Sequence, residues 1–234
     1  MKKTSFLGLA VALLAFCMPQ IQAQEAQLPF TGNIQYKITY QSDVLPAEHL
    51  AQMPVSASIK MSADKMVFEQ ADGNKAIVDA STGEIHTLAN LSMMGLGKYH
   101  IVQNVADVAA DTAEVSAQAL TATGQSKDIH GYKAFEYTSS ITSDQGNVEM
   151  TLWCVPGFCS PVFNWATQVA IGQLNGFPLE YSLKTAAYTM TVSVSKMSYG
   201  EVDAKHFEIH KSYKPSTKEE MSKDIEEMMK AFGM

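Results

Sequence analysis

Two histidines have the spacing of ligands in a helical zinc site. His206 and His210 lie four residues apart, which would place both imidazoles on one face of an α-helix. Residues 205–210, however, alternate polar and apolar as a strand does, with Phe207 and Ile209 on the opposite face. In a strand the two histidines would stand ~13 Å apart, too far to share one zinc ion bound at ~2.0–2.1 Å. We therefore predict no metal site, since the remaining histidines are scattered along the chain.

No pattern typical of a hydrolase or a nucleotide-binding enzyme is present. The stretch 95–98 lacks the first glycine and the Ser or Thr of a phosphate loop, so we interpret it as a turn. The chain has no Gly-x-Ser-x-Gly nucleophile elbow. Glu136, Glu149 and Glu180 lie on the polar sides of strand patterns, and two of them would form a glycosidase pair only if they met within ~5–10 Å in a cleft. We predict that the protein is not an enzyme, has no catalytic residue and needs no cofactor.

Two neighbouring cysteines offer thiol chemistry. Pro156 and Gly157 supply a turn between Cys154 and Cys159, so we expect a disulfide if the chain is exported. Closing so short a loop would stabilise the fold by only ~2 kcal/mol. A redox pair is the alternative, but such pairs have two intervening residues, and here there are four. A thiolate metal site would need two further soft ligands.

The first 23 residues have the layout of a secretory signal peptide. Two lysines precede an unbroken run of apolar residues and glycine, and Ala23 precedes the expected cleavage site, with Ala26 as the second choice. The apolar run is shorter than the ~20 residues of a transmembrane helix. Lipid attachment to Cys17 is the alternative, although Phe16 stands where a lipobox has a small residue. We expect a periplasmic or secreted protein without a transmembrane segment in the mature chain.

The composition and charge of the chain argue against two classes of partner. The chain has 234 residues, of which 46% are hydrophobic and 18% charged, as in globular proteins. Without residues 1–23 it has 15 basic and 24 acidic side chains, a formal charge of −9. This charge argues against nucleic-acid binding, which needs clustered Lys and Arg, and against electrostatic docking on an anionic membrane.

Short, evenly spaced strand patterns dominate the rest of the chain. Apolar and polar residues alternate in segments that include 34–40, 57–61, 177–184 and 188–194, and tight-turn signals such as Asp72-Gly73-Asn74 separate several of them. The alternation changes phase at Lys196-Met197, which predicts a β-bulge. We predict an α+β, mainly β fold in one domain, built on an antiparallel sheet or barrel.

Three segments break the period of two and predict helices. Ser160-Pro161 opens one, with Val162, Trp165 and Val169 on one face. Residues 104–115 are rich in alanine and form the second.

The third predicted helix is amphipathic and lies within residues 214–234. Ser216 and Glu219 would form its capping box. Its apolar stripe consists of Met221, Ile225, Met228 and Phe232. Such a helix either packs on its own domain or binds a partner protein.

Five short motifs occur in order between residues 31 and 213. They are Thr31-Gly-Asn-Ile-Gln-Tyr-Lys-Ile, Ile129-His-Gly-Tyr-Lys-Ala-Phe-Glu-Tyr137, Glu149-Met-Thr-Leu-Trp153, Gly176-Phe-Pro-Leu-Glu180 and Val202-Asp203-Ala-Lys-His-Phe-Glu-Ile209. In this order they resemble a family of uncharacterised exported bacterial envelope proteins, which is itself similar to the lipoprotein-carrier and lipoprotein-sorting proteins (LolA-like and LolB-like).

The resemblance implies an incomplete antiparallel β-barrel, a curved sheet over residues 24–213 with helices on its concave side. In the carriers this arrangement shelters acyl chains. No acyl-binding residue carries over, and the stretch from Cys154 to Cys159 and the methionine-rich terminal helix depart from the carrier pattern.

The leading hypothesis is a non-catalytic envelope protein that shelters an acyl chain, a lipid or a lipoprotein. Burying an acyl chain stabilises by ~0.8 kcal/mol per CH₂, and the fourteen methionines suit either an irregular core or an apolar pocket. The candidate lining residues are large, apolar and near loops or the expected lid helix: Phe163, Trp165, Val169, Met93, Met94 and Leu96. The alternative is an interaction or sensor module without a small ligand, which docks an envelope protein through a sheet edge or residues 216–234.

Overall fold

The computed structural model describes residues 28–71, 73–104, 120–143, 146–159 and 176–231. The expected signal peptide over residues 1–23 and the helix expected from Ser160 lie outside these ranges, as does the helix expected over 104–115 except for Asn104, which ends strand β6. Within them, no helix combines the length and the apolar character needed to cross a membrane.

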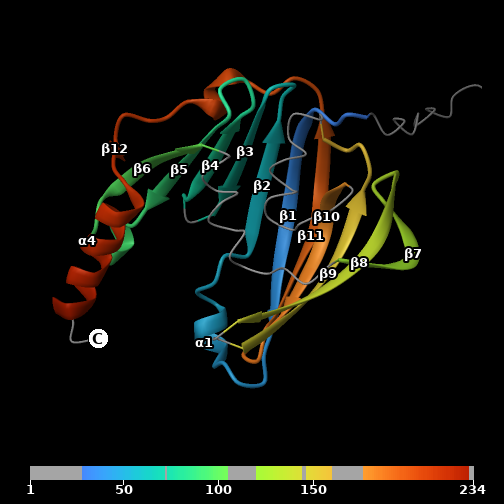
Figure 1. Ribbon diagram of the computed structural model, residues 1–234, viewed down its shortest axis with the longest axis horizontal. Coiled ribbons are helices and arrows are strands. Elements are labelled where there is room, and N and C mark those ends of the chain that lie inside the picture. The colour runs from blue at the N-terminus through green and yellow to red at the C-terminus, as the bar shows by residue number, and fades with distance from the viewer. Residues whose placement is uncertain (1–27, 72, 105–119, 144–145, 160–175, 232–234) are drawn as a thin grey trace, which may run out of the picture.

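One open sheet of twelve strands forms the described part of the chain (Figure 1). Its order is β12-β6-β5-β4-β3-β2-β1-β11-β10-β9-β8-β7, and every pairing is antiparallel except that of β12 with β6. The strands are β1 (Gly32–Gln41), β2 (Ser56–Met61), β3 (Lys65–Gln70), β4 (Lys75–Asp79), β5 (Glu84–Asn90), β6 (Lys98–Asn104), β7 (Thr121–Ile129), β8 (Tyr132–Ser143), β9 (Gly146–Val155), β10 (Phe177–Lys184), β11 (Thr189–Tyr199) and β12 (Lys214–Pro215). The prediction of a mainly β, antiparallel sheet that does not close is confirmed.

Four short or peripheral helices accompany the sheet in the described ranges. They are α1 (Ala47–Leu50), the 3₁₀ turns η1 (Ser92–Met94) and η3 (Ala204–Phe207), and α4 (Lys218–Ala231). The predicted C-terminal helix is therefore confirmed. The helices expected on the concave side stay a prediction, because their residues are not described.

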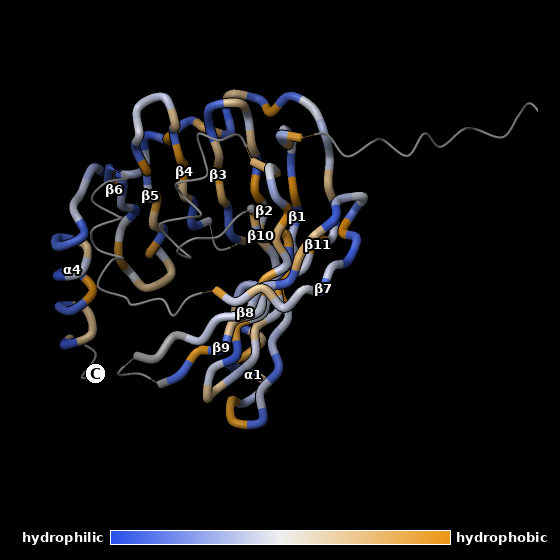
Figure 2. The backbone as a smooth tube through the Cα atoms, turned by 45° about the vertical axis from the view of Figure 1, so that its right-hand side comes forward, coloured by the Kyte–Doolittle hydropathy of each residue, from blue (hydrophilic) through white to orange (hydrophobic). Residues whose placement is uncertain are grey.

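Hydrophobic and hydrophilic residues alternate along several strands (Figure 2), so the two faces of the sheet differ in polarity. In β1, Ile34, Tyr36 and Ile38 are buried, and the residues between them are exposed. We call the side that these three residues share the core face. It carries the main hydrophobic core, whose members from β1, β2 and β11 include Ile34, Tyr36, Ile38, Ala57, Met61, Val192 and Val194.

A bulge keeps β11 in phase with β1. Gln35 pairs with Lys196 and Tyr36 with Val194, so Ser195 has no Cα partner in β1. The Ser195 hydroxyl donates instead to the Gln35 carbonyl at 3.0 Å. Because of the extra residue, Val194 and Met197 both pack in the main core although they are three positions apart. The predicted bulge is confirmed, one residue before Lys196.

The opposite face, which we call the outer face, is covered by the segment after β11. Phe207, Ile209 and Tyr213 pack against a second buried cluster formed by Val67, Ile77 and Leu88. The prediction of a strand over residues 205–210 is wrong, because residues 204–207 form the 3₁₀ turn η3.

A side-chain cap explains why residues 204–207 turn instead of extending. The Asp203 carboxylate accepts the Lys205 backbone N–H at 3.0 Å, which closes the turn at its start. The alternating Phe207 and Ile209 still reach the sheet together.

The terminal helix α4 lies beside β6, near the β12 edge of the sheet (Figures 1 and 2), and its binding to a partner protein stays a prediction. Three members of the predicted stripe, Met221, Ile225 and Met228, are half-buried, and the fourth, Phe232, lies outside the described residues. Two hydrogen bonds hold the segment: the Tyr99 hydroxyl donates to Asp224 Oδ2 at 2.8 Å, and the Ser216 N–H donates to the His100 carbonyl at 2.9 Å.

The capping box of α4 is one residue later than predicted. Thr217, not Ser216, is the N-cap: its hydroxyl accepts the Glu220 N–H at 3.1 Å, and Glu220 Oε2 accepts the Thr217 N–H at 3.0 Å. Ser216 cannot take this role, because its own N–H is already engaged with β6.

The predicted disulfide is absent from the structure, in which Cys154 and Cys159 are free and buried. Consecutive strand residues point to opposite faces, so Cys154 points away from the side that Val155 occupies. Val155 and Cys159 belong to the main core, where Cys159 Sγ lies 4.0 Å from Met61 Sδ. Cys154 packs in a separate cluster with Leu152. The alternation of β9 thus separates the two sulfurs despite the intervening turn.

We predict that neither thiol of the folded protein reacts with a maleimide at pH 7. Burial raises the pKa of Cys154 to about 12 and also raises that of Cys159, so both remain protonated and inaccessible. Protein expressed from residue 24 onwards and denatured without reductant should then react at two thiols per chain, counted by mass spectrometry. If the denatured protein had no reactive thiol, Cys154 and Cys159 would form the disulfide that the sequence predicts. Cys154→Ala is the control and should lower the count to one.

Candidate functional site

An apolar cavity on the core face is the best candidate site in the described part of the chain. It has a volume of about 180 Å³ and lies over five neighbouring strands of the sheet, β3, β2, β1, β11 and β10. The lining residues are Tyr36, Ile38, Tyr40, Pro54, Ala57, Ile59, Phe68, Gln70, Phe177, Pro178, Tyr181, Met190 and Val192. None of them carries a charge at neutral pH, so the cavity suits an uncharged, apolar occupant.

Strand register brings these residues together from opposite ends of the chain. Tyr36 pairs with Ala57 in β2 and with Val194 in β11, and Ile38 pairs with Val192. Directly paired residues share a face, so the alternation in each strand directs these side chains toward the same space.

The polar groups of the cavity are three tyrosine hydroxyls and one amide. The Tyr40 hydroxyl donates to the Pro54 carbonyl at 3.0 Å and holds the loop after β1 against the strand. The Tyr36 hydroxyl is buried, and none of the described residues forms a hydrogen bond with it. Burial, followed by the nearby Tyr181, Cys159 and Glu180, raises the pKa of Tyr36 well above its ordinary value.

A larger, open hollow adjoins the cavity. Its volume is about 610 Å³, and Tyr40 lines both spaces. The hollow is lined mainly by polar residues at the ends of β1 and β10, the start of β11 and the loops beside α1: Gln41, Ser42, Asp43, Val44, Leu50, Lys184, Thr185, Ala186, Ala187, Tyr188 and Thr189.

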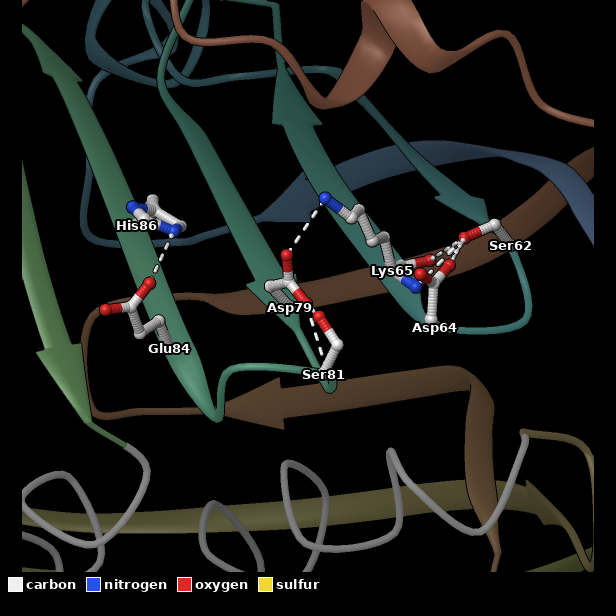
Figure 3. Close-up of polar contacts among 7 residues, drawn as sticks. All are labelled: Ser62, Asp64, Lys65, Asp79, Ser81, Glu84 and His86. Atoms are coloured by element: carbon white, nitrogen blue, oxygen red, sulfur yellow. Dashed lines mark hydrogen bonds and ion pairs between the residues drawn. The ribbon is translucent and has the colours of Figure 1, made fainter.

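The polar cluster on the outer face stabilises the fold (Figure 3). Asp79 is only 8% exposed, and Lys65 Nζ lies 2.9 Å from its Oδ2. The Ser81 hydroxyl and N–H donate to its Oδ1 at 2.5 and 2.9 Å. Burial raises the pKa of Asp79, but the hydrogen bonds from Ser81 and Lys65 outweigh it and lower the pKa to about 2. These contacts join β3 to β4 and hold the following turn.

The histidines do not converge on a metal-binding group in the described residues. His206 lies in η3, and the His210 ring contacts the Ser212 hydroxyl at 2.8 Å. His86 and His100 contact each other on neighbouring strands, with Nδ1 of the first 3.1 Å from Nε2 of the second. Burial and the neighbouring His86 lower the pKa of His100, which favours the neutral form of the His100 imidazole.

The three glutamates considered as an acid pair each have a separate partner. Glu180 forms an ion pair with Lys127, and Glu149 forms one with Lys184 at 2.8 Å. Glu136 accepts a hydrogen bond from the Thr123 hydroxyl at 2.7 Å.

Met93, Met94 and Leu96 are not among the described residues that line the cavity, and whether they contact a ligand stays a prediction. Met93, Met94 and Leu96 lie on the loop between β5 and β6, where Met93 is 94% exposed and Met94 47% exposed. Phe163, Trp165 and Val169 lie outside the described residues, so their role in binding stays a prediction. Sequence reasoning did not select Tyr36 or Tyr40 as lining residues, although both place a polar-tipped ring on the same strand face as Ile34 and Ile38.

No protein-family model matches the chain. A comparison with curated proteins also finds no match. Among solved structures, the chain is similar to lipoprotein LppX of Mycobacterium tuberculosis, with 12% identity and a TM-score of 0.34 over 74% of this chain and 89% of that one. It is similar to LprF from Mycobacterium bovis, with 11% identity and a TM-score of 0.31 over 74% of this chain and 88% of that one. At these values neither similarity carries an argument about function.

We predict that Asp79→Asn destabilises the protein by about 1–3 kcal/mol at neutral pH, because the buried network loses its charge. The pKa of Asp79 is lower in the folded state than in the unfolded state, so its contribution is complete above the ordinary carboxyl pKa of ~4. The contribution is lost as the pH falls from there through about 2. Urea unfolding of wild type and variant between pH 7 and pH 2 measures this difference in unfolding free energy.

Asp64→Asn is the matched control, since Asp64 is an exposed residue of the same hairpin. It should change the unfolding free energy by less than ~0.5 kcal/mol. If the difference in unfolding free energy between wild type and Asp79→Asn stayed constant across the pH range, the stabilising role of the ionised Asp79 carboxylate would be contradicted.

Proposed function

We propose that this is an exported, non-catalytic envelope protein that binds an apolar molecule, an acyl chain or a lipid, on the core face of its open sheet. The carrying observation is the cavity between β1–β3 and β10–β11, which is lined by apolar and aromatic residues without a formal charge. Its apolar lining gains free energy when a hydrocarbon replaces water, at ~25 cal/mol per Å² buried. Export is proposed from the signal-peptide layout of residues 1–23.

The size of the cavity limits what it holds. An apolar cavity of ~150 Å³ accepts a benzene-sized molecule, and whole drug-sized ligands occupy ~300–1,000 Å³. A space of about 180 Å³ therefore suits part of an acyl chain. The adjoining hollow of about 610 Å³ offers room for the rest of a larger, amphiphilic ligand.

A second candidate function is docking of an envelope protein. The exposed Met93 and Met94 on the β5–β6 loop favour it, because methionine adapts to partner surfaces of different shape. Docking would not require the cavity, so a substitution that fills the cavity distinguishes docking from the binding of an apolar ligand.

We predict saturable binding of the neutral apolar dye Nile red, measured by its fluorescence. Val192→Phe and Ile59→Phe each place a ring in the cavity and should weaken this binding at least ~10-fold. Circular dichroism and the thermal midpoint establish that each variant is folded.

Thr191→Phe is the matched control. Thr191 precedes Val192 on β11 and is exposed on the other side of the strand, so this ring should leave the affinity unchanged. Absence of saturable binding by the folded wild type would argue against the proposed function. Equal losses in all three variants would place the dye elsewhere.

A further inference from the structure

Two histidines contact each other on the outer face, beside the place where the end of the chain joins the sheet. Nδ1 of His86 on β5 lies 3.1 Å from Nε2 of His100 on β6, and the two ring centres are 5.3 Å apart. Both rings are half-buried. His86 pairs with Ile77 and His100 pairs with Leu88, so the two imidazoles lie next to the second buried cluster.

The end of the chain is attached to the sheet at the same place. We call residues 209–231 the terminal arm. The His100 carbonyl accepts the Ser216 N–H at 2.9 Å, and β12 pairs with β6 at this residue. Ile209 and Tyr213, which precede β12, pack against the second buried cluster. Because β6 lies between β12 and β5, the arm depends on the pairing of β6 with β5.

The contact between the two rings tolerates one added proton and breaks with two. A hydrogen bond between imidazole nitrogens needs one N–H and one lone pair, so at least one ring must be neutral. Glu84 Oε2 lies 3.5 Å from His86 Nε2 (Figure 3) and balances a charge on His86. A charged His86 still donates to a neutral His100. Once His100 is charged as well, two positive charges face each other across 3.1 Å.

The surrounding charges do not offset a proton on His100. The charged side chains of the strands beside the pair are Lys75 and Asp79 on β4, Glu84 on β5, Lys98 on β6 and Lys214 on β12. Among these, Glu84 is within ion-pair distance of an imidazole, and it lies on the His86 side. A charge on His100 therefore gains no acidic partner in the described part of the chain.

Burial, followed by the neighbouring His86, lowers the pKa of His100. The ordinary pKa of histidine is ~6.5, and the unfolded chain takes up the proton near that value. The stability that the neutral His100 contributes is thus complete above pH ~6.5. It is lost as the pH falls from there through the pKa of the folded state.

We propose that the His86–His100 contact is a pH-sensitive latch for the terminal arm: when both imidazoles carry a proton, the contact breaks, β6 loosens from β5, and the arm loses its attachment to the sheet. In acid, the second buried cluster and the edge of β6 then become accessible. The latch lies on the face opposite the cavity, so its failure would leave the proposed function untouched.

The first test is hydrogen exchange, followed by mass spectrometry, of the protein expressed from residue 24 onwards. After correction for the intrinsic exchange rate, the protection of amides in the terminal arm should fall at least ~5-fold between pH 7.5 and pH 5.0, relative to amides of β1 and β11. Carboxyl groups with an ordinary pKa of ~4 stay mainly ionised in this range, so histidines dominate the change.

Histidine variants assign the fall in protection to the pair. His100→Gln should abolish most of it, because the amide stays neutral at every pH. His210→Gln is the matched control and should keep it, since His210 is an exposed residue of the arm whose ring contacts Ser212. His206→Gln should also keep it, although burial and Lys60 lower the pKa of His206 in η3. A fall that survives in His100→Gln, or that disappears in His206→Gln, would overturn the inference.

The second test measures the pair directly. An NMR titration of the imidazole C–H resonances should give a His100 pKa below ~6.5 in the wild type. His86→Gln should raise this pKa, because a neutral amide replaces a ring that can be charged. Circular dichroism establishes that the variant is folded. An unchanged His100 pKa in folded His86→Gln would show that the two imidazoles do not interact, and the latch would be ruled out.

Discussion

The pairing of β1 with β11 is the contact on which the rest of the structure depends. Strands β1–β6 form one meander and β7–β11 another, and this antiparallel pair is where the two meet. Its end requires glycine: Gly32 has φ of +141°, and a Cβ there would lie 2.1 Å from the Ser198 carbonyl oxygen. A side chain at position 32 would force β1 and β11 apart, so this long-range pairing depends on the glycine.

An aromatic cluster next to this pair ties further segments to it. The Phe30 ring stacks on that of Phe158 at 5.0 Å, and the Phe30 N–H donates to the Phe158 carbonyl at 2.7 Å. Phe158 in turn packs against Tyr132 and Phe177. The start of β1, the turn after β9 and the starts of β8 and β10 are therefore held at one point, just beyond the end of the cavity that Phe177 lines.

The two faces of the sheet differ in how completely their buried groups are packed and hydrogen-bonded. On the outer face, hydrophobic residues of the segment after β11 cover Val67, Ile77 and Leu88, and Asp79 has hydrogen bonds from its neighbours. On the core face a cavity remains, with an unsatisfied hydroxyl at Tyr36. Because the described residues of the core face leave a cavity, we propose that a ligand binds there, whereas the contacts of the outer face support the fold.

The sequence by itself determined the strands whose sides differ in polarity. The alternation around Ile34–Ile38, the phase change near Lys196 and the stripe of α4 each predicted the observed element, because burial of one face leaves a direct trace in residue order. The edge strand β7 was not predicted, because almost all of its residues are exposed and no buried face marks it in the sequence. The 3₁₀ turn at residues 204–207 was missed because one Asp203 cap outweighed an alternating pattern.

Only the tertiary structure decided the site. Tyr36, Ile59 and Val192 lie together because the register of three strands, far apart in the chain, aligns them, and no local pattern encodes that register. The same holds for Cys154 and Cys159, whose spacing in the sequence favoured a disulfide while the alternation of β9 sends their side chains into different clusters. Local patterns report which side of a strand is buried, whereas long-range pairing decides which buried side chains meet and which space they leave unfilled.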